Sequence, residues 1–365
     1  MEGKSCGSAA QRQSLCPGRR LSGRHSGGRF IRVAGIHCEI ALEGFGRRIG
    51  ALRVTHSDET HAFGHVRVPV AVIEGSAGPT VLLVAGNHGD EYEGQAIALG
   101  LLHGLAPEAI SGRLVILPAL NAPAVAAVRR TSPLDQVNMN RAFLGGASAG
   151  PSAAIARWVE ALLPSCAAVI DLHSGGRTAQ YADAALVTRV QDTRLWALHV
   201  ALARAASLPV VQVLGATSSA TSLNSAAAAA GVACLAMELG GAARTSAASL
   251  AAGRAATLRV LAHLGLLQGA PAPVATPRWV AVAGPEAAVV VTSEGIFEPL
   301  VEPGAIVLHD QPVALLHHWR EPERGPATLR AATAGLVLAT AARGKLQPGD
   351  HAALIASLIE EPPPA

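Results

Sequence analysis

Short apolar runs alternate with segments of helical periodicity from about residue 65 to residue 268. Apolar runs bounded by glycine, proline or polar residues are typical of buried strands, whereas apolar residues spaced three and four apart predict helices. We therefore expect strands at 66–73, 81–85, 114–117, 168–172, 210–214 and 232–237. We expect helices at 92–105, 152–163, 193–206, 222–230 and 245–267. Apolar strands alternating with helices predict an α/β fold, with a mixed, mainly parallel sheet and helices on both faces.

The pattern changes after Gly269, where "QGAPAPVATP" is typical of a linker. Two later segments, "EGIFEPLVEPGAIVLHDQPVALL" and "TAGLVLATAARGKLQPGDHAALI", share a glycine, a β run, a Pro-Gly turn and a second β run. This internal duplication predicts a small β-barrel or sandwich, with two unrelated hairpins as the alternative. We expect a main α/β domain at 31–268 and a C-terminal β domain at 275–360.

Residues 1–30 are rich in serine and glycine and hold six basic residues against one acidic residue. We interpret them as a disordered basic leader, with a targeting segment as the alternative. The whole chain has a net charge of +3, so the remainder is close to neutral, which argues against a nucleic-acid surface. No apolar run reaches the roughly 18 residues that a membrane span needs.

The cysteine pattern bears on the cellular compartment. The five cysteines have no tight spacing, which is typical of free thiols in a reducing compartment. We therefore expect a cytoplasmic protein without nucleic-acid or membrane partners, and homo-oligomers remain open.

Chemically reactive side chains directly follow three of the predicted strands. His88 and Glu91, in "GNHGDEYEG", follow the second strand; His173, in "DLHSGG", follows the fourth; Glu238, in "MELGG", follows the sixth. Ligands of open α/β sheets bind at the carboxyl ends of the strands. We therefore expect two imidazoles and two carboxylates to meet at one edge of the sheet.

Two histidines and one glutamate are typical of catalytic zinc, which takes three protein ligands and keeps an open position for water. We predict that His88, Glu91 and His173 bind one Zn²⁺ ion. We expect Asp90 to orient a histidine, and Asp171 to face away from His173 along its strand.

Each of these residues also has a purely structural interpretation. His88 could be a helix-cap partner in a tight turn. Glu91 suits the start of a helix because of the helix dipole. His173 could be a hydrogen-bonded core residue, and Glu238 could pair with an arginine. The convergence of all of them at three strand ends favours the metal site.

Four segments, in the order "GNHGDEYEG", "RTSPLDQVNMNRAF", "DLHSGG" and "MELGG", resemble the succinylglutamate desuccinylase/aspartoacylase family over roughly residues 45–350. This family consists of zinc amidohydrolases with a carboxypeptidase-like α/β fold. The resemblance is strongest to a branch that acts on Nα-acetyl-2,4-diaminobutyrate, which makes this compound the leading substrate. It implies the following roles: zinc ligands His88, Glu91 and His173; general base Glu238; Arg130 beside the scissile carbonyl; Asn140 and Arg141 on the substrate carboxylate.

The sequence departs from the family pattern at two positions. The usual "NRxFPG" is "NRAFLGG" here, and we expect the missing proline to loosen the loop behind Arg141. Arg177, in "HSGGRT", stands where we expect lysine, and we assign it to the substrate's side-chain pocket.

Three functions are compatible with these residues. The first is a zinc-dependent deacylase of a small N-acyl amino acid, favoured by a pocket closed by the C-terminal domain. The second is a zinc carboxypeptidase acting on short peptides, favoured by an open groove. The third is a non-catalytic binding protein with a structural zinc ion, favoured by a fourth protein ligand.

Overall fold

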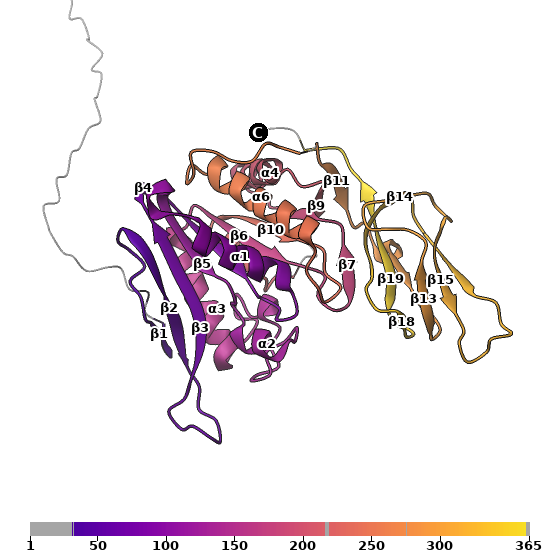
Figure 1. Cartoon of the computed structure of the whole chain (residues 1–365), viewed down its shortest axis with the longest axis horizontal. Helices are drawn as coiled ribbons and strands as arrows, with labels where there is room; N and C mark the ends of the chain where they lie inside the picture. Colours follow the sequence, from indigo (N-terminus) through magenta and orange to yellow (C-terminus); the bar gives the residue numbers. More distant parts are fainter. Residues whose placement is uncertain (1–30, 32, 216–218, 275, 363–365) are drawn as a thin grey trace, which may run out of the picture.

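The computed structural model describes residues 31, 33–215, 219–274 and 276–362, and Figure 1 shows the whole chain. The predicted leader at 1–30, with Cys6 and Cys16, lies outside the described residues. The other three cysteines, Cys38, Cys166 and Cys234, are buried free thiols.

A large mixed sheet runs through the molecule and contains fifteen of the strands in the described residues. Its main path, in spatial order, is β1 (Ile36–Cys38), β2 (Gly46–Thr55), β3 (His65–Glu74), β5 (Ser111–Leu117), β4 (Ser76–Ala85), β6 (Ala168–His173), β10 (Ala233–Glu238), β8 (Ala184–Thr188), β9 (Val210–Leu214), β11 (Arg278–Ala281), β19 (His351–Leu358), β17 (Gly335–Ala341) and β14 (Ile306–Val307). Strands β5, β4, β6 and β10 are parallel, whereas β2 and β3 extend the sheet as an antiparallel ribbon.

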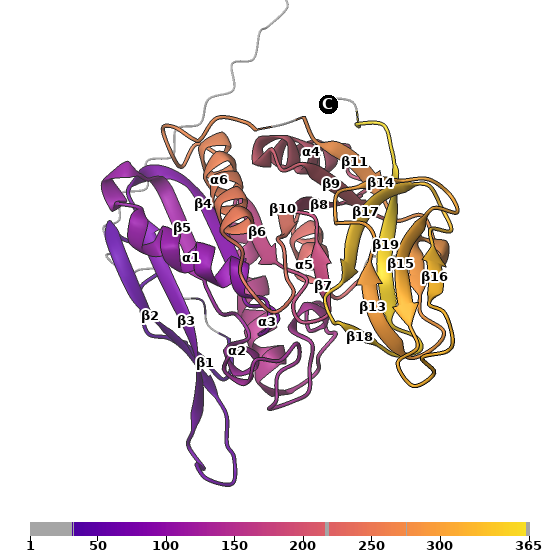
Figure 2. The ribbon, with the colours of Figure 1, turned by 45° about the vertical axis from the view of Figure 1, so that its right-hand side comes forward.

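Helices cover both faces of this sheet, as the alternating strand pattern predicts (Figures 1 and 2). Along β4, Val81 and Leu83 pack in one core, whereas Leu82 and Val84 pack in the other, because successive side chains of a strand point to opposite faces. The first core includes α1 (Tyr92–Gly104), α4 (Thr193–Ala206) and α6 (Ala247–His263); the second includes α3 (Gly150–Leu162) and α5 (Leu223–Ala229). A short helix, α2 (Ala122–Ala127), and the 3₁₀ turns η1 (Pro107–Ala109), η2 (Met139–Arg141), η3 (Leu163–Ser165) and η4 (Pro285–Ala287) complete the set. Within the described ranges, every helix falls short of the length or the apolar content that crossing a membrane requires.

The pattern of apolar residues predicts the central elements well and the flanking ones less completely. Each predicted strand and helix is present, with boundaries that shift by a few residues. Strands β2 and β8 are additional, and β10 pairs antiparallel with β8, so the sheet is mixed. In β2, polar and arginine residues interrupt the apolar positions, which hides the strand from a search for continuous apolar runs.

The C-terminal strands form a small β-sandwich that continues from the main sheet. A second sheet has the order β16 (Ala327–Arg330), β15 (Pro312–His317), β13 (Gly295–Pro299) and β18 (Lys345–Leu346). Two further strands, β12 (Ala288–Val290) and β7 (Ala179–Tyr181), pair with β19 and β17.

The strand pairing within this sandwich follows the predicted sequence duplication. Strand β13 pairs with β15 and β18, and in the same way β17 pairs with β19 and β14. Each half of the duplicated segment therefore gives its short middle strand to the other half.

Candidate metal and catalytic site

Three parallel strands bring the predicted site residues to one edge of the sheet. In the pairing of β4 with β6, Ala85 lies opposite Leu172, and in the pairing of β6 with β10, His173 lies opposite Glu238. His88 and Glu91 follow β4 in the turn that leads into α1. This turn lies close to α2, because a Cβ atom on Gly89 would lie 2.0 Å from the Ala124 carbonyl oxygen. A glycine at this position is therefore a packing requirement.

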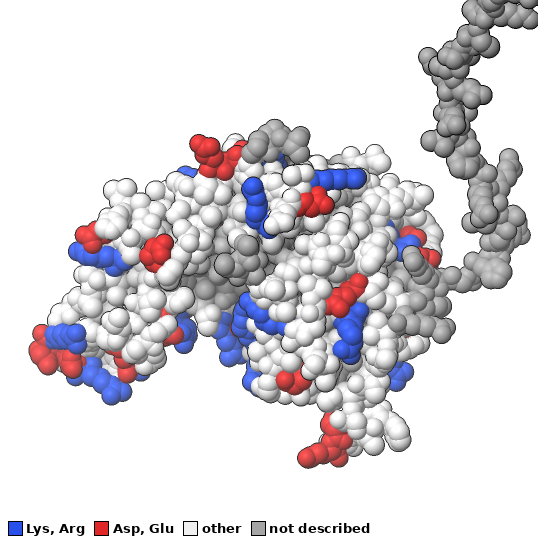
Figure 3. Space-filling model, turned by 180° about the vertical axis from the view of Figure 1, so that it is seen from behind, with Lys and Arg blue, Asp and Glu red and all other residues white. Residues whose placement is uncertain are grey.

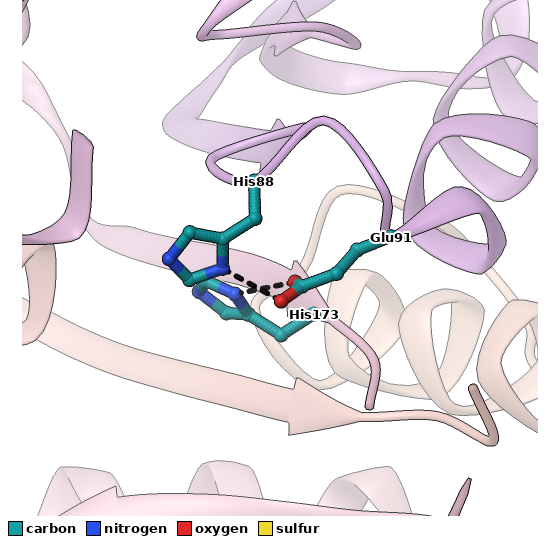
Figure 4. A group of neighbouring side chains, drawn as sticks. All are labelled: His88, Glu91 and His173. Atoms are coloured by element: carbon teal, nitrogen blue, oxygen red, sulfur yellow. Dashed lines mark hydrogen bonds and ion pairs between the residues drawn. The ribbon is translucent and has the colours of Figure 1, made fainter. Parts of the chain in front are cut away.

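His88, Glu91 and His173 form a compact buried group, and each side chain is at most 7% exposed. Figure 4 shows both imidazole rings beside the Glu91 carboxylate. His88 Nδ1 lies 2.6 Å from Glu91 Oε1, and His173 Nδ1 lies 2.9 Å from Glu91 Oε2. Glu91 occupies the N-cap position of α1, yet its side chain makes no capping hydrogen bond with the helix. The same three residues therefore come together as the sequence predicts.

The chemistry of this group fits a divalent metal ion. One ligand atom from each of the three side chains lies within 4.8 Å of the other two. Imidazole nitrogen and carboxylate oxygen are ligands that Zn²⁺ prefers in proteins. The Nδ1 atoms and the carboxylate oxygens face the same small space, so these three residues could hold one ion.

A second side chain holds the distal nitrogen of each histidine. His173 Nε2 donates to Asp171 Oδ2 at 2.9 Å, and Asn87 Nδ2 donates to Asp171 Oδ1 at 2.8 Å. His88 Nε2 donates to Asn138 Oδ1 at 3.0 Å. Such partners fix the orientation of a ligand imidazole and leave its other nitrogen free for a metal.

Two expectations about these partners are wrong. Asp171 does not face away from His173, because residues two apart on a strand project from the same face. Asp90 makes no hydrogen bond to a histidine in the described part of the chain; its Oδ2 accepts a hydrogen bond from the backbone N–H of Arg177 at 3.2 Å. Asn138 was not expected, although it lies in the motif "NMNR" that directed attention to Asn140 and Arg141.

The charges in the group shift the pKa values of its members. Burial opposes ionisation of Glu91, but His88 and His173 outweigh it and hold the pKa of Glu91 well below its ordinary range. Burial also opposes the charge on His173, but Asp171 and Glu91 flank this ring and raise its pKa well above the usual value. The two flanking carboxylates therefore favour the protonated form of His173 over the neutral form.

Glu238 differs from Glu91 in its surroundings. Its side chain is partly exposed, while its Oε2 atom is enclosed without a hydrogen-bond partner in the described part of the chain. Burial, and next the charge of Glu91, raise the pKa of Glu238 to about 8, against the opposing effects of His173 and Arg130. Burial and then Glu238 also raise the pKa of Tyr181, which keeps that phenol protonated. A carboxyl group with a pKa near neutrality suits proton transfer.

The arginines of the predicted site lie around this group. Arg130 Nη1 lies 3.3 Å from Glu91 Oε1, and 56% of its side chain is exposed. Partial burial and then the charge of Arg130 lower the pKa of Arg141. The two guanidinium groups are therefore close enough to repel each other. The side-chain oxygen of Asn140 accepts a hydrogen bond from the backbone N–H of Leu223 at 3.0 Å. Arg177 is exposed, and its guanidinium donates to the carbonyl of Val128.

The loop with the missing proline has a well-defined local structure. Leu144, which stands in place of the proline, has a φ of 51°, a left-handed conformation that proline cannot adopt. Its backbone N–H, which proline lacks, donates to Glu160 Oε1 at 2.6 Å. The loop behind Arg141 is therefore tied to α3, in place of the loosening that the sequence suggested.

The C-terminal sandwich lies next to the loop that follows His173. Strand β7 pairs with β17 through Gln180 and Thr340, and a cavity of about 340 Å³ lies beside this pairing. Its lining includes Tyr181 from β7, Arg343 from the loop between β17 and β18, and His351 from β19. Figure 3 shows basic side chains gathered at the notch between the C-terminal sandwich and the main body.

Comparisons with known proteins agree with this architecture. A family model described as the succinylglutamate desuccinylase/aspartoacylase catalytic domain matches residues 77–264. The curated N-alpha-acetyl-L-2,4-diaminobutyric acid deacetylase of Halomonas elongata is 32% identical over 332 residues, which cover 90% of this chain and 97% of that protein.

Solved structures show the same similarity. The product-bound structure of an ectoine utilization protein from Ruegeria pomeroyi has a TM-score of 0.84 at 32% identity, and the match covers 89% of this chain and 100% of that chain. A succinylglutamate desuccinylase/aspartoacylase from Rhodobacter sphaeroides has a TM-score of 0.82 at 30% identity, and the match covers 90% of this chain and 100% of that chain.

Proposed function

Because the chain belongs to the succinylglutamate desuccinylase/aspartoacylase family, we propose that it is a zinc-dependent deacylase of a small N-acyl amino acid. Hydrolysis of the amide bond would release a carboxylate and a free amine. The leading substrate is Nα-acetyl-2,4-diaminobutyrate, since the curated relative from Halomonas elongata is a deacetylase of that compound. The observation that carries the proposal is the convergence of His88, Glu91 and His173 beside Glu238 at one sheet edge.

His88 Nδ1, His173 Nδ1 and the Glu91 carboxylate would hold the zinc ion. When bound in such a site, zinc lowers the pKa of a coordinated water towards about 7 and polarises a carbonyl group. Asp171 and Asn138 keep the two imidazoles oriented for this task.

Glu238 would act as the general base. Its backbone lies opposite His173 in the strand register, and the charge of Glu91 contributes to its raised pKa; both observations support a carboxylate close to the predicted ligands. It would take a proton from the attacking water and give that proton to the leaving amine, which otherwise departs poorly.

Arg130 and Arg141 would supply the positive charge that the reaction needs. As the carbonyl oxygen gains negative charge, the exposed Arg130 guanidinium beside Glu91 could stabilise it, an effect of about 3 kcal/mol for one such donor. Arg141 offers a planar fork that matches the substrate carboxylate, and Asn140 lies next to it in the chain. Arg177 remains assigned to the side-chain pocket, although its bond to Val128 also makes it a brace between two loops.

The C-terminal strands favour a deacylase over a carboxypeptidase. The pairing of β7 with β17 brings the predicted C-terminal domain at 275–360 against the predicted catalytic domain at 31–268. Tyr181, on the paired strand β7, lies close enough to Glu238 for that carboxylate to affect the pKa of its phenol, so the C-terminal strands adjoin the predicted site. A site bordered in this way would suit a small substrate better than a peptide chain. In the described residues the group with metal-ligand spacing has three members, which supports a catalytic ion over a closed structural one.

The test combines zinc analysis with a substrate panel. The protein is stripped of metal, reloaded with zinc, and assayed on N-acyl amino acids and on short peptides. We expect one zinc ion per chain and hydrolysis of N-acyl amino acids, with Nα-acetyl-2,4-diaminobutyrate the best substrate. Glu238→Gln should keep its zinc and lose about 10²- to 10⁴-fold in kcat. Full activity in this variant removes Glu238 from the mechanism, and hydrolysis of peptides alone favours the carboxypeptidase.

A further inference from the structure

Glu93 is a buried carboxylate that the proposed mechanism does not use. It lies in the first turn of α1, two residues after Glu91, and its exposed fraction is 1%. Burial of a carboxyl group costs free energy unless hydrogen bonds compensate for the lost water. Its contacts therefore indicate what the position requires.

One hydrogen bond joins Glu93 to the turn that follows Glu238. The backbone N–H of Gly241 donates to Glu93 Oε1 at 3.0 Å, across 148 residues of sequence. Gly241 has a φ of 127°, and a Cβ atom there would lie 2.4 Å from the Ala179 carbonyl oxygen. The turn at 240–241 is therefore closely packed against β7, and Glu93 holds it from the side of α1.

The other carboxylate oxygen of Glu93, Oε2, is buried without a hydrogen-bond partner in the described part of the chain. Burial raises the pKa of Glu93, and the nearby Ser174 side chain partly opposes this rise, although the Ser174 hydroxyl makes no hydrogen bond within the described residues. The backbone N–H of Ser174 donates to Glu91 Oε2 at 3.2 Å. Glu91 therefore holds the loop after β6 and Glu93 holds the turn after β10, and both glutamates lie at the start of the helix that follows β4.

Backbone hydrogen bonds hold the same turn from its other side. The carbonyl of Gly240 accepts from the N–H of Tyr181 at 2.8 Å and from that of Gly175 at 3.3 Å. The N–H of Leu239 donates to the carbonyl of His173 at 3.1 Å. These bonds tie the turn to the β6–β7 loop, whereas the bond to Glu93 ties it to the metal-ligand turn.

We propose that Glu93 is a positioning residue: it holds the turn at 240–241 against α1, and through this turn it fixes the Glu238 carboxylate relative to Glu91 and His173. This inference rests on the proposed function, because it takes Glu238 as the general base. The physical reason for this role is the short distance over which a general base must act. A general base acts within about 3 Å of the proton that it takes, and a displacement of about 1 Å costs roughly 100-fold in rate.

Two substitutions separate the effect of side-chain length at Glu93 from the effect of its charge. Glu93→Asp keeps the charge but withdraws the carboxylate by one methylene from Gly241; we expect kcat to fall about 10- to 100-fold, with KM and zinc content unchanged. Glu93→Gln keeps an oxygen acceptor at the same reach, and we expect kcat within about threefold of the wild type. Glu74 is the matched control, because it accepts a hydrogen bond from the backbone N–H of Gly44 at 2.7 Å. Glu74→Asp and Glu74→Gln should leave kcat unchanged.

Hydrogen exchange gives a readout that needs no substrate. The backbone amides of 238–243 should exchange faster in Glu93→Asp than in the wild type, and at the wild-type rate in Glu93→Gln. A wild-type protein that hydrolyses no panel compound would refute the proposed function. The difference in amide exchange between the two Glu93 variants would still test whether Glu93 holds the turn at 240–241.

Three results overturn the inference: equal kcat in the two Glu93 variants, loss of zinc together with activity in Glu93→Asp, or unchanged exchange in that variant. If Glu93→Asp does not fold, Glu93→Ala takes its place, because it removes the acceptor of the Gly241 N–H. Faster exchange at 238–243 in Glu93→Ala supports the inference, and exchange at the wild-type rate overturns it.

Discussion

Two glutamates at opposite edges of the sheet each lie against several nitrogen-bearing side chains, yet they are suited to different tasks. Glu91, at the carboxyl edge, lies against His88, His173 and Arg130. Glu74 ends β3 opposite Arg113 at the start of β5, and it accepts hydrogen bonds from Arg48 at 2.9 Å and Arg113 at 3.3 Å. Since β5 runs parallel to β4, this cluster lies at the edge remote from the metal-ligand turn.

The kind of partner distinguishes the two clusters. Guanidinium groups only donate hydrogen bonds, whereas an imidazole can lose its proton and offer a lone pair to a metal. Exposure differs as well, since the Glu74 side chain is 17% exposed and the Glu91 side chain is 3% exposed. A cluster of opposite charges is therefore weak evidence for a functional site, and a buried carboxylate shared by two imidazoles is much stronger evidence.

Removing each carboxylate should give the largest contrast. Glu91→Ala should abolish zinc binding and lower kcat/KM by more than about 10³-fold, since the ion is worth several kcal/mol to the transition state. Glu74→Ala should leave both unchanged and reduce the free energy of unfolding by about 1–2 kcal/mol, because Arg48 and Arg113 lose their partner. Zinc analysis, steady-state kinetics and urea unfolding measure these effects. Retained zinc in Glu91→Ala would contradict the predicted ligand set.

Substitution of the hydrogen-bond partners of the two histidines should have an intermediate effect on zinc affinity and kcat. Asp171→Asn replaces a charged acceptor with a neutral amide, and we expect zinc affinity or kcat to fall about 10- to 100-fold. Asn138→Ala should cost less, because a hydrogen bond to a neutral amide is weaker than one to a carboxylate. Competition with a chromogenic chelator measures the zinc affinity of both variants. A larger loss in Asn138→Ala than in Asp171→Asn would show that the charge of Asp171 is not what holds His173.

The sequence predicts residues at strand ends better than it predicts their partners. His88, His173 and Glu238 follow from the position of apolar runs, because the carboxyl ends of parallel strands share an edge. The role of Asp171 could also have been predicted, since the two-residue period of a strand puts it on the same face as His173.

Other features depend on packing between distant segments. The bond between Glu93 and Gly241 spans 148 residues, and the bond between His88 and Asn138 spans 50. No local pattern encodes either contact, because each depends on how the loops meet after the sheet has formed. The duplication in the C-terminal strands was predictable, but the exchange of the short strands β14 and β18 was not.

The smallest effect concerns the stability of the metal-free protein as a function of pH. The pKa of Glu238 is raised to about 8, so above the ordinary glutamate value of 4.5 the folded state keeps a proton that the unfolded chain loses. The raised pKa of His173 acts in the same direction: its contribution to stability is complete below pH 6.5 and is lost as the pH rises through the folded-state pKa. The lowered pKa of Glu91 gives a contribution that is lost only in acid, below 4.5. Thermal unfolding should therefore show a Tm that falls between pH 5 and pH 8.

Three comparisons sharpen this prediction. Glu238→Gln should flatten the fall in Tm, because the variant has no carboxyl group to ionise at that position. Glu74→Ala should lower the whole curve without changing its slope, since the arginines around Glu74 keep their charge over this range. Added zinc should oppose the fall, because its ligands must lose their protons to bind and its affinity rises with pH. A Tm of the metal-free protein that rises from pH 5 to pH 8 would mean that the imidazolium of His173 does not contribute to the stability of the fold.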